Sequence, residues 1–585
     1  MKNFLRTALA IGLVVVALST QAKAQTVVLD GLGSSALFLQ LGLAANSSSG
    51  PIDAPCVWSD NTNASLASDS STGSTETDKG SSWVAWTTGS DGTCATAGNI
   101  YAYLQTDSVV GNRCLFNSNL STRECFTTYP TTPPSPAGLI LSGGTANCGT
   151  TGECPLPSSV VTALNSTTQL VNFAGTDIRP EDAEFAVTRA LVTTANCGSP
   201  VTTGSQYLGL GYSNGGNILS AFSSSVFHVI SFSLPSSFTV TPVGATPIVV
   251  VVNGDGTSSG FSNTSITNIT SQALAYFLDG TYSYTQQVLS PTGTGDAATV
   301  LIREPLSGTY NTMEYNVPNR VGTVGGSSPT FATSQDVGAN QLSAQVNCNG
   351  TVAPTTAMNI STASGGARKR AIGTGQELAE VLATPNSLGY GFWSTANFAN
   401  YTGAGSAANA KYLTVDGVDP LLQASLTGTT CTTGVLPNAG TAQIACVDLH
   451  TTADGNYPIW SLLRLVTVGS APTALTELAT AAQGFVPTGT TAARPDFVIP
   501  AKLNVVRSHF TPPLQTVTPA NGDRELGGAL NAGNACSTLL DAGGDVGGVV
   551  IGLRSATFTE SPLTLSDTSY CSTNHVTVGQ TGHRR

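Results

Sequence analysis

The strongest signal in the sequence is the stretch Val300-Leu-Ile-Arg-Glu-Pro-Leu-Ser-Gly-Thr309. Its apolar first half predicts a strand that ends at Arg303, and its Ser-Gly-Thr turn predicts a helix that opens at Tyr310. Helix N-terminal N–H groups, hydroxyl donors and a guanidinium together suit a tetrahedral oxyanion. Taken alone, the stretch is more typical of a capped helix beside a surface arginine, so the rest of the chain must decide.

Three other turns have a similar character, because each follows an apolar, strand-like run. The first is residues 31–35, between a predicted strand at 26–30 and a predicted helix at 36–45. The second is residues 107–111, after a predicted strand at 100–104. The third is residues 174–177, after an apolar segment at 171–173. Each turn alone is more typical of an ordinary loop, and Asp177 alone of a helix N-cap.

Two continuous apolar runs, 247–252 and 457–467, predict strands that are covered on both faces. Residues 270–278 and 375–383 have helical character, whereas the Ser-, Thr-, Gly- and Pro-rich segments 59–82, 127–155 and 351–366 predict long loops. These elements together predict an α/β fold class with loop- and β-rich insertions.

Composition narrows the class of protein. Only 10% of the 585 residues are charged and 63 are glycine, which excludes a coiled coil and a charge-rich disordered chain. The net charge of −12 argues against binding to a nucleic-acid backbone or to anionic lipid. An anion would need a local site that works against the field of the whole protein.

The N-terminus has the pattern of a secretory signal peptide, residues 1–24. Lys2 and Arg6 precede an apolar run at 8–18, and Ala22-Lys-Ala24 offers small residues for cleavage after Ala24. No cysteine follows that point to carry a lipid, and no later apolar run is long enough to span a bilayer. We expect a periplasmic or extracellular protein without a membrane anchor.

Twelve cysteines in an exported chain favour disulfides. Five pairs are close in sequence: 56 with 94, 114 with 125, 148 with 154, 431 with 446, and 536 with 571. The sequence does not settle which cysteines are bonded to each other. No Cys-x2-Cys pair is present and the five histidines are scattered, so we expect no zinc site, and we predict no cofactor.

In their order along the chain, the four turns resemble those of the phosphate-binding proteins of phosphate ABC importers. That family has a strand followed by Gly-x-Gly-x-Thr-Phe, then Ser-x-Gly-Gly, Phe-Gly-x-Ser-Asp and Arg-x3-Ser-Gly-Thr. The segments that match its motifs are 31–36, 108–111, 173–177, 249–253, 275–280, 303–309, 388–390, 415–418 and 456–460. Each match is modest, but their common order is hard to produce by chance.

The resemblance implies a type II periplasmic-binding-protein fold, with lobe I at residues 25–246 plus 456–585 and lobe II at 247–455. It implies crossover strands and a hinge near Pro247 and Tyr457, inorganic phosphate as ligand, an ABC permease as partner, and a monomer. The phosphate-binding residues that it implies are Ser35, Ala36, Ser108, Asp177, Arg303, Ser307, Gly308 and Thr309, with Ala36, Gly308 and Thr309 acting through backbone N–H groups.

Asp177 is the unusual member of this set, because an acceptor-only carboxylate repels anions. It helps only a ligand that brings a proton, as phosphate does and sulfate does not. The chain departs from the family at Ser35 and Ala36, where the family has Thr and Phe, and at Pro305, where the family has an acidic residue that orients the arginine.

Two other classes of function stay open. A secreted surface or adhesion protein built on the same fold would explain the Thr-, Gly- and Asn-rich insertions. An exported phosphatase is the weaker alternative, because the sequence has no Gly-x-Ser-x-Gly elbow and no histidine–carboxylate cluster. We therefore predict a binding protein and not an enzyme.

Overall fold

The computed structural model describes residues 25–48, 50–60, 81–116, 129, 131–141, 148, 152–166, 169–180, 183, 234–279, 281–303, 307–317, 358–361, 366–371, 373–393, 409–422, 431–437, 446–484, 496–503, 505–507 and 550–553. They form a mixed α/β structure around one 13-stranded sheet. The strand order is β2-β3-β4-β1-β5-β13-β6-β11-β8-β10-β9, with β12 beside β6 and β7 beside β12. A separate pair joins β14 (Val505–Arg507) to β15 (Val550–Leu553).

One end of this sheet, here called the first half-sheet, contains six strands. They are β1 (Thr26–Ser34), β2 (Cys56–Asp60), β3 (Ser82–Thr88), β4 (Ala97–Thr106), β5 (Phe173–Thr176) and β13 (Trp460–Val468). Strand β1 is parallel to both β4 and β5, so these three strands end at one edge. The helices of this half are α2 (Phe38–Asn46), α3 (Ser108–Phe116), α4 (Ser158–Leu164) and α13 (Thr473–Gly484).

The second half-sheet contains β8 (Thr299–Arg303), β9 (Met358–Ser361), β10 (Ala367–Ala371) and β11 (Ser387–Phe392), with β7 (Asn268–Ile269) and β12 (Ala410–Val415) attached. Strand β8 is parallel to β10 and β11, which again brings strand ends to one edge. Helices α7 (Ser271–Asp279), α8 (Gly308–Asn316), α11 (Gly373–Ala383) and α12 (His450–Ala453) belong to this half.

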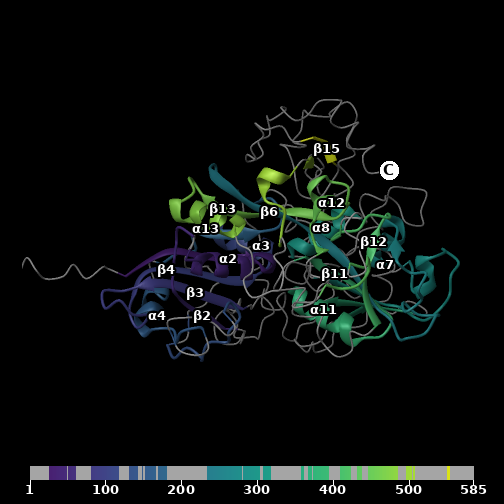
Figure 1. Ribbon diagram of the computed structural model, residues 1–585, viewed down its shortest axis with the longest axis horizontal. Helices are drawn as coiled ribbons and strands as arrows, with labels where there is room; N and C mark the ends of the chain where they lie inside the picture. The colour runs from purple at the N-terminus through teal and green to yellow at the C-terminus, as the bar shows by residue number, and fades with distance from the viewer. Residues whose placement is uncertain are drawn as a thin grey trace, which may run out of the picture.

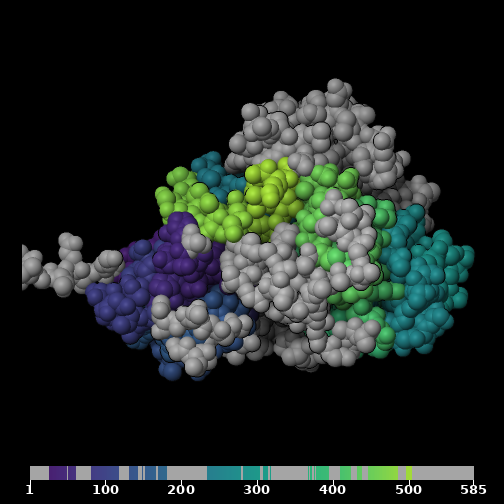
Figure 2. All heavy atoms as spheres, viewed as in Figure 1, coloured from purple at the N-terminus to yellow at the C-terminus, as the bar shows by residue number. Residues whose placement is uncertain are grey.

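Strand β6 (Phe238–Asn253) connects the two half-sheets. Its first part is antiparallel to β13 up to the pair Pro247 and Trp460, and its second part, from Ile248, is antiparallel to β11. Figure 1 shows the two groups of elements side by side with β6 between them. In Figure 2 the purple and blue N-terminal residues and the teal residues likewise occupy opposite ends of the molecule.

Burial explains the apolar runs that the sequence displays. Val249, Val250 and Val252 are buried, as expected for a strand covered on both faces. The largest core cluster is continuous from Leu37 and Phe173 in the first half to Ile302 and Leu388 in the second. The strand ends at which the site residues lie are therefore held by a packed interior.

Most predicted elements are present, with three corrections. The loop predicted at 351–366 contains strand β9, which pairs with β10. Residues 31–34 continue β1 instead of forming a turn, because Gly31 faces the Phe173 ring and Gly33, at φ 136°, lies against the Gly175 carbonyl. A side chain at either glycine would collide with β5, so the strand continues only because both lack a Cβ. Residues 108–111 are likewise not a turn, because they form the first turn of α3.

Three of the close cysteine pairs are disulfides: Cys56–Cys94, Cys148–Cys154 and Cys431–Cys446. The pair 536 with 571, residue 125, the signal peptide at 1–24 and the loop segments 61–80 and 351–357 lie outside the described residues. Within the described part of the chain, no helix has the length and apolar character needed to cross a membrane.

Candidate anion-binding site

The predicted site residues lie where the strand ends of the two half-sheets face each other. From the first half come Ser35 after β1, Ser108 at the start of α3, and Asp177 after β5. From the second half come Arg303 at the end of β8 and the α8 N-terminus, residues 307–309. The carboxyl ends of strands are the usual place for a ligand site in an α/β sheet.

Asp177 is buried, with 2% of its surface exposed. The Ser108 hydroxyl donates a hydrogen bond to Asp177 Oδ1, and the Asp177 backbone N–H donates to Ser108 Oγ at 3.1 Å. Burial raises the pKa of the Asp177 carboxyl, although hydrogen bonds from Ser108 and Ser34 and the charge of Arg303 lower it. The site thus holds a carboxyl group that is costly to ionise and well supplied with hydroxyl partners.

Arg303 is also buried, at 1% exposure, so the interpretation of a surface arginine is wrong. Its Nη2 lies 3.2 Å from Asp107 Oδ1 in an ion pair that joins the two half-sheets. Its Nη1 donates to Thr309 Oγ1 at 3.4 Å and to Thr374 Oγ1. These contacts fix the guanidinium plane, which is the role that the family gives to an acidic residue two positions after the arginine.

The α8 N-terminus completes the site. Ser307 is the N-cap, and its Oγ accepts from the Tyr310 N–H at 3.3 Å. Gly308 lies so close to the first half that a Cβ there would be 2.6 Å from Asp177 Oδ2 and would also collide with Ser108 Oγ. The helix dipole therefore points its positive end at the buried carboxyl.

Direct contacts link five of the eight predicted residues into one cluster: Ser108, Asp177, Arg303, Gly308 and Thr309. Ser307 joins it as the cap of α8. Ser35 is buried beside them in the short 3-10 helix Ser35–Leu37, and the Ala36 N–H donates to Ser34 Oγ at 3.1 Å. The Ala36 N–H thus has a protein acceptor in this structure.

Sequence reasoning missed Ser34, Asp107 and Thr374. Ser34 both caps the 3-10 helix and bonds to Asp177, and the prediction named only its neighbour Ser35. Thr374 is the second residue of α11, which follows β10. This repeats the strand–glycine–helix pattern, and that pattern could have identified Thr374. Asp107 lies 196 residues from its partner, and no local pattern indicates that pair.

Charge defines what the cluster can hold. Among these site residues, two carboxylates, Asp107 and Asp177, face one guanidinium, so the eight predicted residues plus Asp107 are net negative when both carboxylates are ionised. A second buried guanidinium, that of Arg464, donates to the Asp177 carbonyl at 3.4 Å and balances this charge from the backbone side of Asp177. A ligand that shares a proton with Asp177 avoids like-charge repulsion, whereas a fully deprotonated anion does not.

Comparison with known proteins gave no match to a family model and none among curated proteins. Solved structures that resemble the chain include a phosphate-binding protein from Stenotrophomonas maltophilia, at 15% identity and TM-score 0.27, covering 68% of this chain and 81% of that one. An ABC-type phosphate transport receptor from Vibrio cholerae gives 13% identity and TM-score 0.23, covering 43% of this chain and 68% of that one. TM-scores this low support no inference about this chain, so its function must be inferred from its own geometry.

Proposed function

We propose that this chain is an exported solute-binding receptor that captures inorganic phosphate, or a related protonated tetrahedral oxyanion, between its two half-sheets. The observation that carries the proposal is one buried cluster across those halves: Gly308 lies against the Asp177 carboxyl, and its neighbour Thr309 accepts a hydrogen bond from the buried Arg303. Burying a carboxyl group and a guanidinium together lowers the stability of the fold, so such an arrangement indicates a ligand site or a specific contact.

Each group has a role in this proposal. Arg303 supplies charge to the oxyanion, and the hydroxyls of Ser35, Ser108, Ser307 and Thr309 supply donors. The backbone N–H groups of Ala36, Gly308 and Thr309 add further donors. The Ala36 N–H donates to Ser34 Oγ in this structure, so it must give up that hydrogen bond to donate to the ligand. Asp177 accepts the ligand's proton, which excludes sulfate.

Ligand entry requires the half-sheets to separate, because the cluster is buried. The junction at Pro247 and Trp460 is the natural hinge, since β6 changes partner there from β13 to β11. An ABC permease is the partner that would receive the released anion, and the exported location rests on the signal-peptide pattern.

Calorimetric titration of the purified protein with phosphate, arsenate, sulfate and molybdate tests the proposal. Phosphate and arsenate should bind, and sulfate and molybdate should bind much more weakly, because both are fully deprotonated near neutral pH. An adhesion protein would give no heat with any of them, and a phosphatase would hydrolyse a phosphomonoester. Equal affinity for sulfate and phosphate would contradict the role given to Asp177.

A further inference from the structure

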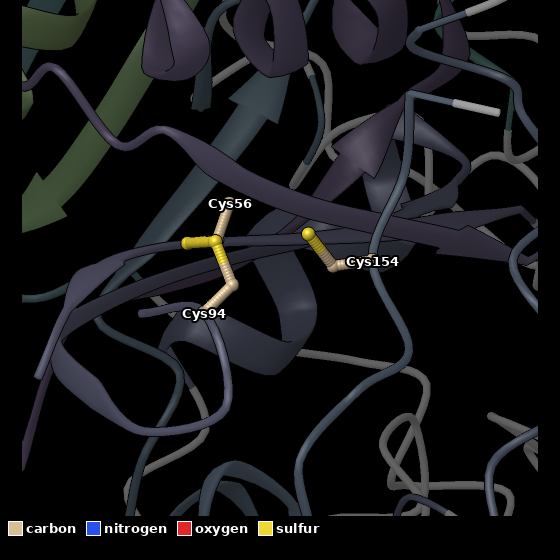
Figure 3. A group of neighbouring side chains, drawn as sticks. All are labelled: Cys56, Cys94 and Cys154. Atoms are coloured by element: carbon tan, nitrogen blue, oxygen red, sulfur yellow. A yellow bond between two sulfur atoms is a disulfide. The ribbon is translucent and has the colours of Figure 1, made fainter. Parts of the chain in front are cut away.

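Two disulfides meet on the first half-sheet, and none of their cysteines belongs to the anion site. The Sγ atoms of Cys56, Cys94 and Cys154 all lie within 4.8 Å of one another (Figure 3). Cys154 is bonded to Cys148. All three sulfurs are in disulfides, so they supply no thiolate to a metal ion. The arrangement instead places one disulfide within reach of a sulfur from another.

The four sulfurs differ in exposure. Cys56 and Cys154 are 0% and 1% exposed, Cys94 is 8% exposed, and Cys148 is half-buried. A groove of about 740 Å³ is lined by Cys94, Cys148 and Cys154, but not by Cys56. A small thiol from solvent therefore reaches Cys148 first, and Cys56 is shielded.

The backbone holds Cys154 beside β2 whether or not its disulfide is intact. The Cys154 N–H donates to the Val57 carbonyl at 2.6 Å, and the Glu153 carboxylate accepts from Ser59 Oγ at 2.7 Å. The same carboxylate accepts from the N–H groups of Gly138 and Ile140 at 3.0 and 2.9 Å. A Cys154 side chain freed from Cys148 would remain next to Cys56–Cys94 and reach it by rotation about one torsion.

The geometry points to a thiol–disulfide exchange site, with a small thiol as its co-substrate and Cys148 as its point of entry. The thiolate attacks Cys148 Sγ, the Cys148–Cys154 bond breaks, and Cys154 leaves as a thiolate. The Cys154 thiolate then attacks Cys56 Sγ, forms Cys56–Cys154, and expels Cys94 as a thiolate that takes a proton from water. One external thiol ends as a mixed disulfide on Cys148, and the number of disulfide bonds is unchanged.

The choice of Cys56 as the attacked sulfur follows from the leaving group. Attack on Cys56 releases the thiolate of Cys94, which lines the groove, whereas attack on Cys94 would release a thiolate at buried Cys56. Burial in apolar surroundings raises the pKa of a thiol and makes it a poorer leaving group. The exchange therefore moves the free thiol to the groove and keeps the new bond in the interior.

Peptide mapping after brief exposure of the native wild-type protein to reduced glutathione tests this inference. After an acid quench, alkylation and digestion, glutathione should be found on Cys148, the alkyl group on Cys94, and a crosslink between Cys56 and Cys154. Alkylation of Cys154 with Cys56–Cys94 intact would overturn the inference, as would glutathione on other cysteines with both disulfides unchanged.

The same digest contains a comparator. Cys431–Cys446 has no third cysteine in a comparable group among the described residues, so its reduction should give only its own two thiols. A Cys56→Ala/Cys94→Ala variant removes the acceptor disulfide and should shift alkylation to Cys154. If that variant does not fold, the wild-type map alone decides, because it distinguishes Cys94 from Cys154 as the alkylated residue.

Discussion

Gly308→Ala sets two physical effects against each other at the centre of the site. Gly308 is the first residue of α8, where alanine is the better helix former by up to about 1 kcal/mol. The added methyl, however, would lie 2.6 Å from Asp177 Oδ2 and would also collide with Ser108 Oγ. Helix propensity alone predicts a more stable protein, and packing predicts a less stable one.

Packing should win, because neither neighbour can move away cheaply. Asp177 and Ser108 are both buried and bonded to each other, and Asp177 belongs to a chain segment fixed by β5. Overpacking a buried site costs about 1–3 kcal/mol, which exceeds the gain in propensity. We expect a net loss of about 1–2 kcal/mol in the free energy of unfolding, together with weaker phosphate binding.

Chemical denaturation of wild type, Gly308→Ala and Gly484→Ala checks this expectation. Gly484 is the last residue of α13 and a Cβ there meets nothing within 4 Å, so its substitution isolates the local effect of alanine. Gly484→Ala should be neutral or slightly stabilising. If Gly308→Ala is as stable as Gly484→Ala, then α8 does not press against Asp177 in solution and the proposed anion site is not formed.

Three further substitutions probe the charges. Arg303→Ala should weaken phosphate binding by about 2–5 kcal/mol, which is at least roughly 30-fold, with the fold retained in its circular dichroism; unchanged affinity in calorimetry would place the site elsewhere. Asp107→Asn leaves the buried Arg303 guanidinium without its carboxylate and should lower the free energy of unfolding by about 3 kcal/mol. This is the lower end of the usual cost of breaking a buried ion pair, because Thr309 and Thr374 still bond to Arg303. Phosphate should then raise the Tm of this variant more than that of wild type, and an equal rise would count against Asp107 as the counter-ion. Asp177→Asn should strengthen sulfate binding more than it weakens phosphate binding in competition calorimetry. Because burial raises the pKa of Asp177 in the folded protein, the stability that its protonated form contributes is complete below about pH 3.8 and is lost as pH rises through the raised pKa. The unfolding free energy of wild type minus that of Asp177→Asn should therefore fall with rising pH. A rise would show that folding lowers this pKa instead.

Local patterns in the sequence were sufficient where a segment's own residues determine its structure. The valine run of β6 and the apolar run before Arg303 are strands because they are buried on both faces, and both were predicted. The turn after Arg303 does open a helix, although α8 begins at Gly308 instead of Tyr310. The cap at Ser307 explains this difference, since it satisfies the Tyr310 N–H within the helix.

Features that depend on distant contacts were not predictable in the same way. The β1 segment at Gly31 and Gly33 has the composition of a turn, and only its packing against β5 makes it a strand. The Asp107–Arg303 ion pair joins residues far apart in the chain, and a single sequence carries no sign of that pairing.

The central claim is that a protonated tetrahedral oxyanion binds between Asp177 and Arg303, and a crystal structure of the protein grown with phosphate tests it most directly. We expect phosphate to lie between the two half-sheets, with Arg303 and Ser108 donating to its oxygens and Asp177 within hydrogen-bond distance of one of them. The claim would be contradicted by phosphate bound elsewhere, or by a phosphate-saturated protein in which Ser108 still donates to Asp177 and no anion contacts Arg303.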